Sequence, residues 1–237
     1  RVARLLLAGV PPERMLLLTF TRRAALEMTR RAQKVMAEAL AARSSSATRV
    51  PDHLRLPWSG TFHSIGNRLI REYAPRLGLD PGFSVLDRGD AADLMDVVRH
   101  RLGFSKTVKR FPRKDTCLAI YSHRVNTMGS LGATLRDVFP WCAEWEAELT
   151  RLFRLYVEKK LASQALDYDD LLLFWKELVA DAKEGPRVRE RFDRVFVDEY
   201  QDTNRLQYAI LRGLKPDGRG LTVVGDDAQS IYSFRAA

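Results

Sequence analysis

Two adjacent carboxylates, Asp198 and Glu199, follow a short apolar run and are the residues best suited to chemistry in this chain. The run, residues 195–197, consists of β-branched and aromatic side chains, which predicts a strand buried on both faces of a parallel sheet. Open α/β sheets bind ligands at the carboxyl ends of such strands. One carboxylate there can hold Mg²⁺, while the other accepts a proton from an attacking water. On this pair alone, a solvated turn after a core strand stays open as an alternative.

A second apolar run, residues 221–224, also ends in a polar turn, which begins with Gly225-Asp226-Asp227 and contains Gln229. Two strands that both end in acidic, glutamine-containing turns would give one edge of a sheet a polar rim. The γ-phosphate of a nucleotide and its metal ion need such a rim, whereas a protein core does not. We therefore expect the two turns to belong to one phosphate-binding site.

Two further segments indicate a strand or turn that leads directly into a helix. Residues 15–20 form a buried-strand pattern that passes through Thr21 into a segment with apolar residues at helical spacing. Such a turn offers backbone N–H groups and a helix N-terminus to an anion. Gly60-Thr61-Phe62-His63-Ser64 opens a second helix, in which His63 is either a phosphate or base contact or a plain capping residue.

The composition favours a polyanionic partner. The net charge is +9, and residues 99–124 contain eight Lys or Arg side chains but only one acidic residue, Asp115. Positive blocks of this kind suit nucleic acid, although charge that only confers solubility is the plainer alternative. The two cysteines lack metal-ligand spacing, and the sequence contains no signal peptide and no membrane-length apolar run. We therefore expect a cytoplasmic protein with reduced thiols and no membrane partner.

The pattern of apolar residues predicts an α/β fold with a mainly helical insertion. Strand-like runs are frequent in residues 1–80 and 167–237 but scarce in residues 81–166, where helical spacing dominates. Glu158 and Lys160 match the Glu-x-Lys of some nucleases, but they fall within a predicted helix, so we give them no catalytic role. An aromatic and apolar stripe in the predicted helix 141–161 is expected to be core: Trp141, Trp145, Leu149, Phe153 and Tyr156.

Four segments resemble, in order, the motifs of the UvrD/Rep-type superfamily 1 DNA helicases. Residues 19–28 look like motif Ia, and residues 60–64 like motif Ib. Asp198-Glu199-Tyr200-Gln201-Asp202-Thr203-Asn204 is similar to motif II, the DExx box, and residues 225–235 resemble motif III. The resemblance covers essentially the whole chain, most weakly residues 80–166. It implies a RecA-like, P-loop NTPase-type domain 1A into which residues 81–166 are inserted as domain 1B.

The resemblance also implies roles for single residues. Asp198 would coordinate the Mg²⁺ of Mg-ATP, Glu199 would orient and deprotonate the hydrolytic water, and Gln229 would sense the γ-phosphate. Arg235 would link the DNA side of motif III to the nucleotide side, and the basic helical segment would suit the duplex ahead of a fork. Contacts to single-stranded DNA, by base stacking or through backbone phosphates, are implied for Phe20, Thr21, Thr61, His63, Tyr232 and Phe234.

The phosphate loop of that family, G-x-x-x-x-G-K-[ST], occurs nowhere in the 237 residues, and neither does the second motor domain. We therefore expect the motor region of an ATP-dependent 3′–5′ DNA helicase of repair or recombination, with the remaining helicase domains as partners and little ATPase activity alone. Two alternatives stay open. One is a non-catalytic module that binds single-stranded DNA or protein. The other is a metal-dependent nuclease, against which Gln201 and the Gln229 turn argue.

Overall fold

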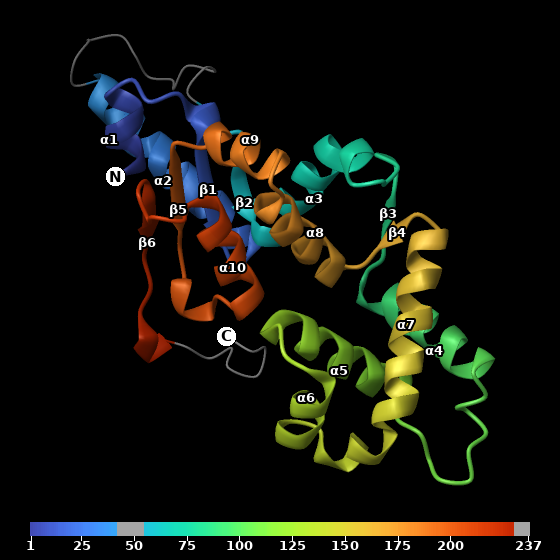
Figure 1. Ribbon diagram of the computed structural model, residues 1–237. Coiled ribbons are helices and arrows are strands. Elements are labelled where there is room, and N and C mark those ends of the chain that lie inside the picture. Colours follow the sequence, from blue (N-terminus) through green and yellow to red (C-terminus); the bar gives the residue numbers. More distant parts are fainter. Residues whose placement is uncertain (42–54, 230–237) are drawn as a thin grey trace. The chain divides into compact units, whose positions relative to one another are not determined.

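The computed structural model describes residues 1–41 and 55–229, which form two compact units (Figure 1). The first unit comprises Arg1–Gly66, Leu178–Thr203 and the described part of Ile210–Ile231, and it contains a parallel sheet. The second unit comprises Asn67–Glu177 and Asn204–Ala209 and is mainly helical. The predicted α/β fold class is confirmed, whereas the domain boundaries expected after residues 80 and 166 stay a prediction.

The sheet of the first unit has the strand order β2-β1-β5-β6, and all three pairings are parallel. In the register, Leu18 of β1 lies opposite Gly60 of β2 and Val197 of β5, and Val197 lies opposite Val223 of β6. All four chain segments therefore leave the sheet at the same edge. The strands are β1 (Met15–Thr19), β2 (Ser59–Thr61), β5 (Arg194–Val197) and β6 (Leu221–Val223).

The side chains of strand β1 are buried on both faces of the sheet. Met15 and Leu17 pack with residues of α1 (Val2–Leu7) and α2 (Arg22–Ala41) in one apolar cluster, and Leu16 and Leu18, which alternate with them, are equally buried on the other face. Such two-sided burial is typical of parallel sheets. The other helices and turns that contribute to this unit are η1 (Pro12–Arg14), α3 (Phe62–Tyr73), α9 (Glu184–Arg191), η5 (Tyr200–Asp202), α10 (Arg205–Leu214) and η6 (Asp227–Gln229).

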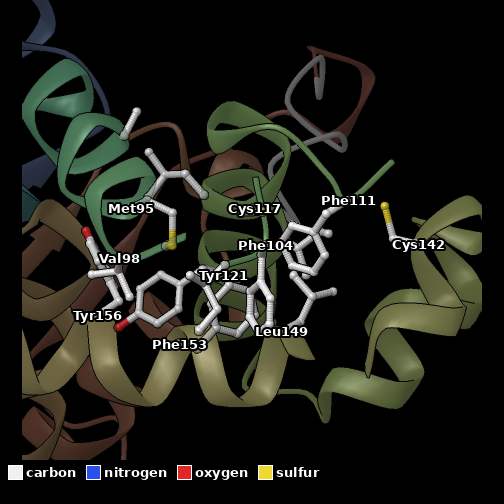
Figure 2. Packing of buried hydrophobic residues seen from close by; sticks show 14 of the residues in the cluster. Met95, Val98, Phe104, Phe111, Cys117, Tyr121, Cys142, Leu149, Phe153 and Tyr156 are labelled. Atoms are coloured by element: carbon white, nitrogen blue, oxygen red, sulfur yellow. The ribbon is translucent and has the colours of Figure 1, made fainter. Parts of the chain in front are cut away.

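The second unit is a helical bundle with its own apolar core (Figure 2). Tyr121 packs edge-to-face on both Phe153 and Tyr156, with ring centroids 5.4 and 5.3 Å apart. A short parallel pair of strands, β3 (Ser84–Val85) and β4 (Ala165–Leu166), closes the insertion. The helical elements are η3 (Ala74–Arg76), α4 (Arg88–Arg101), α5 (Lys114–Thr127), α6 (Leu131–Asp137), η4 (Pro140–Trp145), α7 (Glu146–Ala162) and the start of α8 (Tyr168–Ala180).

The predicted aromatic stripe is correct from Trp145 onward but wrong for Trp141, which is 67% exposed. The physical reason is a change of helix type: Pro140 begins the 3₁₀ turns of η4, and α7 begins only at Glu146. Because a 3₁₀ helix has three residues per turn, Trp141 does not continue the buried face of α7.

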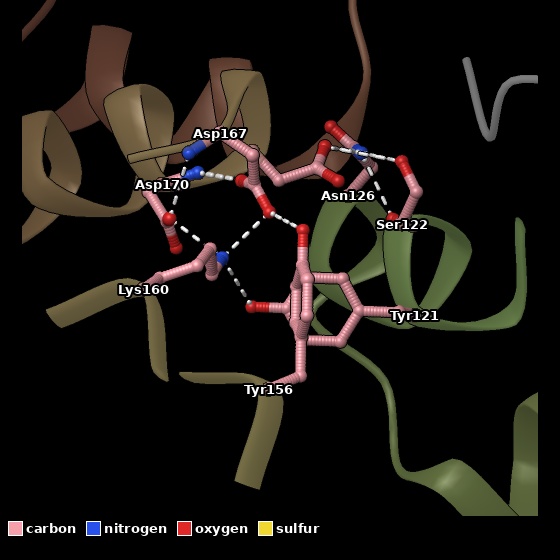
Figure 3. Close-up of polar contacts among 8 residues, drawn as sticks. Tyr121, Ser122, Asn126, Tyr156, Lys160, Asp167 and Asp170 are labelled. Carbon is pink, nitrogen blue, oxygen red and sulfur yellow. Dashed lines mark hydrogen bonds and ion pairs between the residues drawn. The ribbon is translucent and has the colours of Figure 1, made fainter. Parts of the chain in front are cut away.

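A buried ion cluster joins the end of α7 to the start of α8 (Figure 3). The Lys160 side chain is 1% exposed, and its Nζ lies 2.5 Å from Asp167 Oδ2 and 2.6 Å from Asp170 Oδ2. The Tyr156 hydroxyl also donates to Asp167 Oδ2, at 2.8 Å. Burial, and then the charge of Asp167, raises the pKa of Asp170 to about 7, although Lys160 opposes this shift. One cation therefore compensates two buried carboxylates.

Two further features of the described residues are the length of their helices and the state of the two cysteines. No helix in residues 1–41 or 55–229 is both long and apolar enough to cross a membrane. Cys117 and Cys142 are free and buried, and burial raises the pKa of the Cys117 thiol to about 12. Cys117 is therefore a neutral packing residue and not a reactive thiolate.

Replacing Lys160 with Met removes the cation between the two carboxylates, and we expect it to lower the free energy of unfolding by about 3–5 kcal/mol at pH 8. The loss is expected to be smaller at pH 5.5. Asp170 has a folded-state pKa above its unfolded value, so its ionisation opposes folding as the pH rises through about 7. At pH 5.5 it is protonated, and one uncompensated charge disappears.

Urea unfolding of both proteins at the two pH values measures this difference. The matched control is Lys159→Met, because Lys159 is the partly exposed neighbour on the same helix and its replacement should change stability by less than about 0.5 kcal/mol. Equal losses for the two variants, or a Lys160→Met loss that does not shrink at pH 5.5, would contradict the role of Lys160 as the shared counter-ion.

Candidate functional site

The polar segments singled out in the sequence all follow strands of one parallel sheet, so they lie together at its carboxyl edge. This edge is where open α/β sheets bind their ligands. The two acidic turns and the two strand-to-helix turns share this edge, while their role as one phosphate-binding site stays a prediction. Thr21 lies just beyond β1, Phe62 follows β2, Asp198 follows β5 and Val224 follows β6.

Asp198 and Glu199 form a sharp turn at the end of β5. The Asp198 N–H donates to the Leu18 carbonyl and the Tyr200 N–H to the Val224 carbonyl, each at 2.9 Å. Between these two anchors, Glu199 adopts φ 53° and ψ 45°, in the left-handed region. This conformation costs a non-glycine residue about 1–3 kcal/mol, so the surrounding bonds must enforce it. The turn holds the exposed Glu199 carboxylate next to the partly buried Asp198.

Gln201 binds both acidic turns through the two ends of its side-chain amide. Its Nε2 donates to Glu199 Oε2 at 2.7 Å, and its Oε1 accepts from the Asp226 N–H at 3.1 Å. Asp226 in turn accepts from the Ala228 N–H at 3.1 Å and from Gln229 Nε2 at 2.7 Å. The two turns are therefore one hydrogen-bonded unit that has Glu199 at one end and Gln229 at the other.

Asp202 is a buried acid in the same turn, with 7% of its surface exposed. Its pKa is raised, first by burial and then by the charge of Glu199. Its Oδ1 accepts no hydrogen bond from the described residues. A buried acceptor without a partner is costly, so this oxygen indicates that the turn can take a further donor or a cation.

The acids at this edge fit a magnesium ion that is held mainly by a nucleotide. Mg²⁺ usually binds one or two carboxylates and completes its coordination with waters and phosphate oxygens. Asp198 supplies a carboxylate at the strand end, and Asp202 Oδ1 is an unsatisfied acceptor close by in the chain. Residues 1–41 and 55–229 contain no group of three or more potential ligands, so an all-protein metal cage is not among their features.

Thr21 and Thr61 play the same local part in two neighbouring turns, because each caps the helix that follows. Thr21 Oγ1 accepts from the Ala24 N–H at 3.1 Å at the start of α2, and Thr61 Oγ1 accepts from the Ser64 N–H at 3.2 Å at the start of α3. Since β1 and β2 are adjacent, both helix N-termini lie at the same sheet edge. Such ends carry partial positive charge that attracts phosphates.

Two more of the predicted DNA contacts are described by the structure, and both are partly buried. Phe20 follows β1 directly, and His63 lies in the first turn of α3. Phe62, between Thr61 and His63, is 4% exposed and belongs to the core. The roles of these residues toward DNA stay predictions. Three further predicted contacts lie outside the described residues: Tyr232, Phe234 and Arg235.

The bridge made by Gln201 was not predicted from the sequence, which identified this residue only as a polar neighbour of Asp198 and Glu199. The sequence contained one indication of this close contact, the glycine at position 225. A Cβ atom at this position would lie 2.7 Å from Gln201 Oε1 and 3.1 Å from the Gln201 backbone nitrogen. A glycine directly after a strand can mark such a close approach, but the sequence does not name the partner.

The chain matches the model of the UvrD/REP helicase N-terminal domain over residues 1–237. It is 31% identical over 223 residues to DNA helicase II of Haemophilus influenzae, an alignment that covers 92% of this chain and 28% of that protein. It is 30% identical over 234 residues to the ATP-dependent DNA helicase PcrA of Staphylococcus aureus, covering 96% and 29%. PcrA of Leuconostoc citreum is 32% identical over 232 residues, covering 97% and 28%.

The chain thus spans between 28% and 29% of the length of these relatives, and it aligns along nearly all of its own length. The family match covers all four polar segments, which the fold brings to one edge of the sheet. The resemblance noted in the sequence is confirmed. The chain belongs to the UvrD/REP helicase N-terminal domain family.

Proposed function

We propose that this chain is the N-terminal motor region of an ATP-dependent DNA helicase that moves 3′ to 5′ along single-stranded DNA. The observation that supports it best is the shared edge of the sheet, where the Asp198–Glu199 turn, the Gln229 turn and two helix N-termini lie together. A motor needs its nucleotide groups and its DNA groups on one rigid support, so that a change at one affects the other. The names of the relatives, DNA helicase II and PcrA, agree with this function.

In the proposed reaction, Asp198 and Glu199 have different tasks. Mg²⁺, when bound with the nucleotide, neutralises phosphate charge, and Asp198 is the residue that would hold it. Glu199 is exposed at the tip of the turn, where it would orient the attacking water and accept its proton. Gln229, which Asp226 holds at 2.7 Å, would bond to the γ-phosphate and register its loss after hydrolysis.

Single-stranded DNA would run past the turns after β1 and β2. The N-termini of α2 and α3 would attract two backbone phosphates, and the capping hydroxyls of Thr21 and Thr61 lie at these ends. Phe20 and His63, next to them in the chain, offer rings for base stacking. Stacking is worth about 1–3 kcal/mol per base and does not depend on the base sequence. Such contacts suit a protein that must step along any strand.

Duplex DNA would contact the long loop between α4 and α5, residues 102–113 (Figure 1). Phe104 and Phe111 anchor the loop, since both are buried and their rings lie 4.8 Å apart. Between them Val108 is fully exposed, and Lys106 and Arg110 form no ion pair with any described residue. Cations that are not neutralised by neighbouring acids are free to bind phosphates.

The sequence contains no G-x-x-x-x-G-K-[ST], whose backbone and lysine would cradle the β- and γ-phosphates. We therefore propose that this region alone hydrolyses ATP poorly or not at all. The relatives, of which the chain spans 28% or 29%, contain further sequence that could supply the missing phosphate site. Hydrolysis would then depend on the remaining domains of a longer protein.

The first test replaces Glu199 with Gln in the full-length protein that contains this chain. We expect kcat for DNA-stimulated ATP hydrolysis to fall by about 10²–10⁴-fold, because the base is removed while the side chain keeps its size. In a parallel assay the purified 237 residues should hydrolyse no ATP above background. Robust DNA-stimulated activity of this purified region, abolished by Glu199→Gln, would contradict the dependence on other domains.

The second test concerns the loop. Replacing Lys106 and Arg110 together with Ala should weaken binding to a forked duplex and reduce the slope of log K against log salt by about 0.9 for each phosphate that the protein no longer neutralises. Fluorescence anisotropy at several NaCl concentrations measures this slope. Arg136→Ala, which removes an exposed cation from α6, is the control. An unchanged slope for the double variant, or an equal change for Arg136→Ala, would exclude the loop as the duplex-binding surface.

A module that binds single-stranded DNA without catalysis is the alternative, and the paired helix N-termini would serve it equally well. Such a module has no use for a carboxylate exposed at the sheet edge beside Asp198. It predicts that the full-length protein shows no DNA-stimulated ATPase activity at all, and that Asp198→Ala with Glu199→Ala leaves binding to single strands unchanged. The Glu199→Gln experiment therefore also separates these two functions.

A further inference from the structure

We propose that Gln201 is a positioning residue for ATP hydrolysis, which sets the orientation of the Glu199 carboxylate and joins it to the turn that carries Gln229. This inference rests on the function proposed above. It adds a residue to which neither the family resemblance nor the names of the relatives give a role.

The orientation of the Gln201 amide follows from its two partners. A carboxylate only accepts hydrogen bonds and a backbone N–H only donates them, so Nε2 must face Glu199 Oε2 and Oε1 must face the Asp226 N–H. Rotating the amide by about 180° would break both bonds. The 2.7 Å bond to Glu199 is short, as expected when the acceptor carries a charge.

This bond restricts a side chain that would otherwise be free. Glu199 is exposed, and a glutamate on the surface samples several rotamers. A general base must lie within hydrogen-bond reach of the water from which it takes a proton. By holding Oε2, Gln201 limits the carboxylate to a narrow set of positions and leaves Oε1 for the water. The base is thus already ordered before the substrate binds.

A backbone hydrogen bond also holds the two turns close together. The Tyr200 N–H donates to the Val224 carbonyl at 2.9 Å, one residue before Gln201 in its segment and two residues before Asp226 in the other. Gly225 permits this approach, because a Cβ there would meet Gln201 Oε1 at 2.7 Å and the Tyr200 nitrogen at 3.2 Å. A larger residue would displace Gln201 Oε1 from its bond to the Asp226 N–H.

Three successive hydrogen bonds connect the base with the proposed γ-phosphate sensor. They run from Glu199 to Gln201, from Gln201 to Asp226, and from Asp226 to Gln229. A displacement of Gln229 that moves Asp226 would therefore also pull on the amide of Gln201. The orientation of the base would then depend on the occupancy of the γ-phosphate site.

The test uses Gln201→Ala and Gln201→Glu in the full-length protein, with ATPase kinetics on saturating single-stranded DNA. For Gln201→Ala we expect kcat to fall by about tenfold to hundredfold, while KM for ATP changes by less than about twofold. Gln201→Glu keeps the size of the side chain and an acceptor for the Asp226 N–H, but it presents a negative oxygen to Glu199. It should reduce kcat at least as much as Gln201→Ala.

A residue that only fills space predicts the opposite order, with the isosteric Gln201→Glu retaining more activity than Gln201→Ala. Gln33→Ala, which removes a partly buried glutamine from α2, is the matched control and should keep wild-type kcat. Circular dichroism melting confirms that each variant is folded. A kcat within about twofold of wild type, an effect confined to KM, or an active Gln201→Glu would overturn the proposal.

Glu199→Gln, measured beside these variants, separates the two levels of inference. If it abolishes hydrolysis while Gln201→Ala does not reduce it, the role of Gln201 is wrong and the proposed function stands. If Glu199→Gln leaves kcat unchanged, the proposed function itself fails, and the positioning role fails with it.

Discussion

The parallel pairing of β1 with β2 and β5 is the interaction on which the first unit depends. Met15 to Leu18 are completely buried, and the pairing of Leu18 with both Gly60 and Val197 sets the level at which all three strands end. A slip of one residue would turn the buried side chains of β1 to the wrong faces. It would also carry Thr21 away from the level of the Asp198 turn. Core packing and site geometry are thus fixed by the same register.

Much of this could be predicted from the sequence, because a run such as residues 15–18 has few stable environments besides the interior of a parallel sheet. Polar residues directly after two such runs must then share an edge. The features that could not be predicted depend on partners distant in the chain. The contact of Gln201 with Asp226 spans 25 residues. The left-handed Glu199 lies between backbone bonds to Leu18 of β1 and to Val224, which follows β6. The exposure of Trp141 was predicted wrongly because local helix type, not periodicity, decides it.

Charges in the second unit illustrate the same limit. Glu158 and Lys160 matched a nuclease pattern, but residues two apart on a helix point in different directions. Glu158 is exposed, whereas Lys160 is buried between Asp167 and Asp170. The sequence indicated where one helix ends and where the next begins with acidic residues. Only the fold shows that a single lysine pairs with both acids. Lys160 therefore acts as the counter-ion between the end of α7 and the start of α8.

The two linked turns of the site differ in how strongly the sheet supports them. Glu199 follows β5, which is paired on both sides, whereas Gln229 follows β6, which ends the sheet among the described residues and leaves Val223 and Val224 exposed. Local stability is lower where fewer buried contacts hold the backbone. A ligand that binds between the turns would therefore displace the β6 side more easily than the β5 side. Under the proposed role of Gln201, the signal would run from the phosphate sensor to the base, so that loss of the phosphate shifts a base that Gln201 has already aligned.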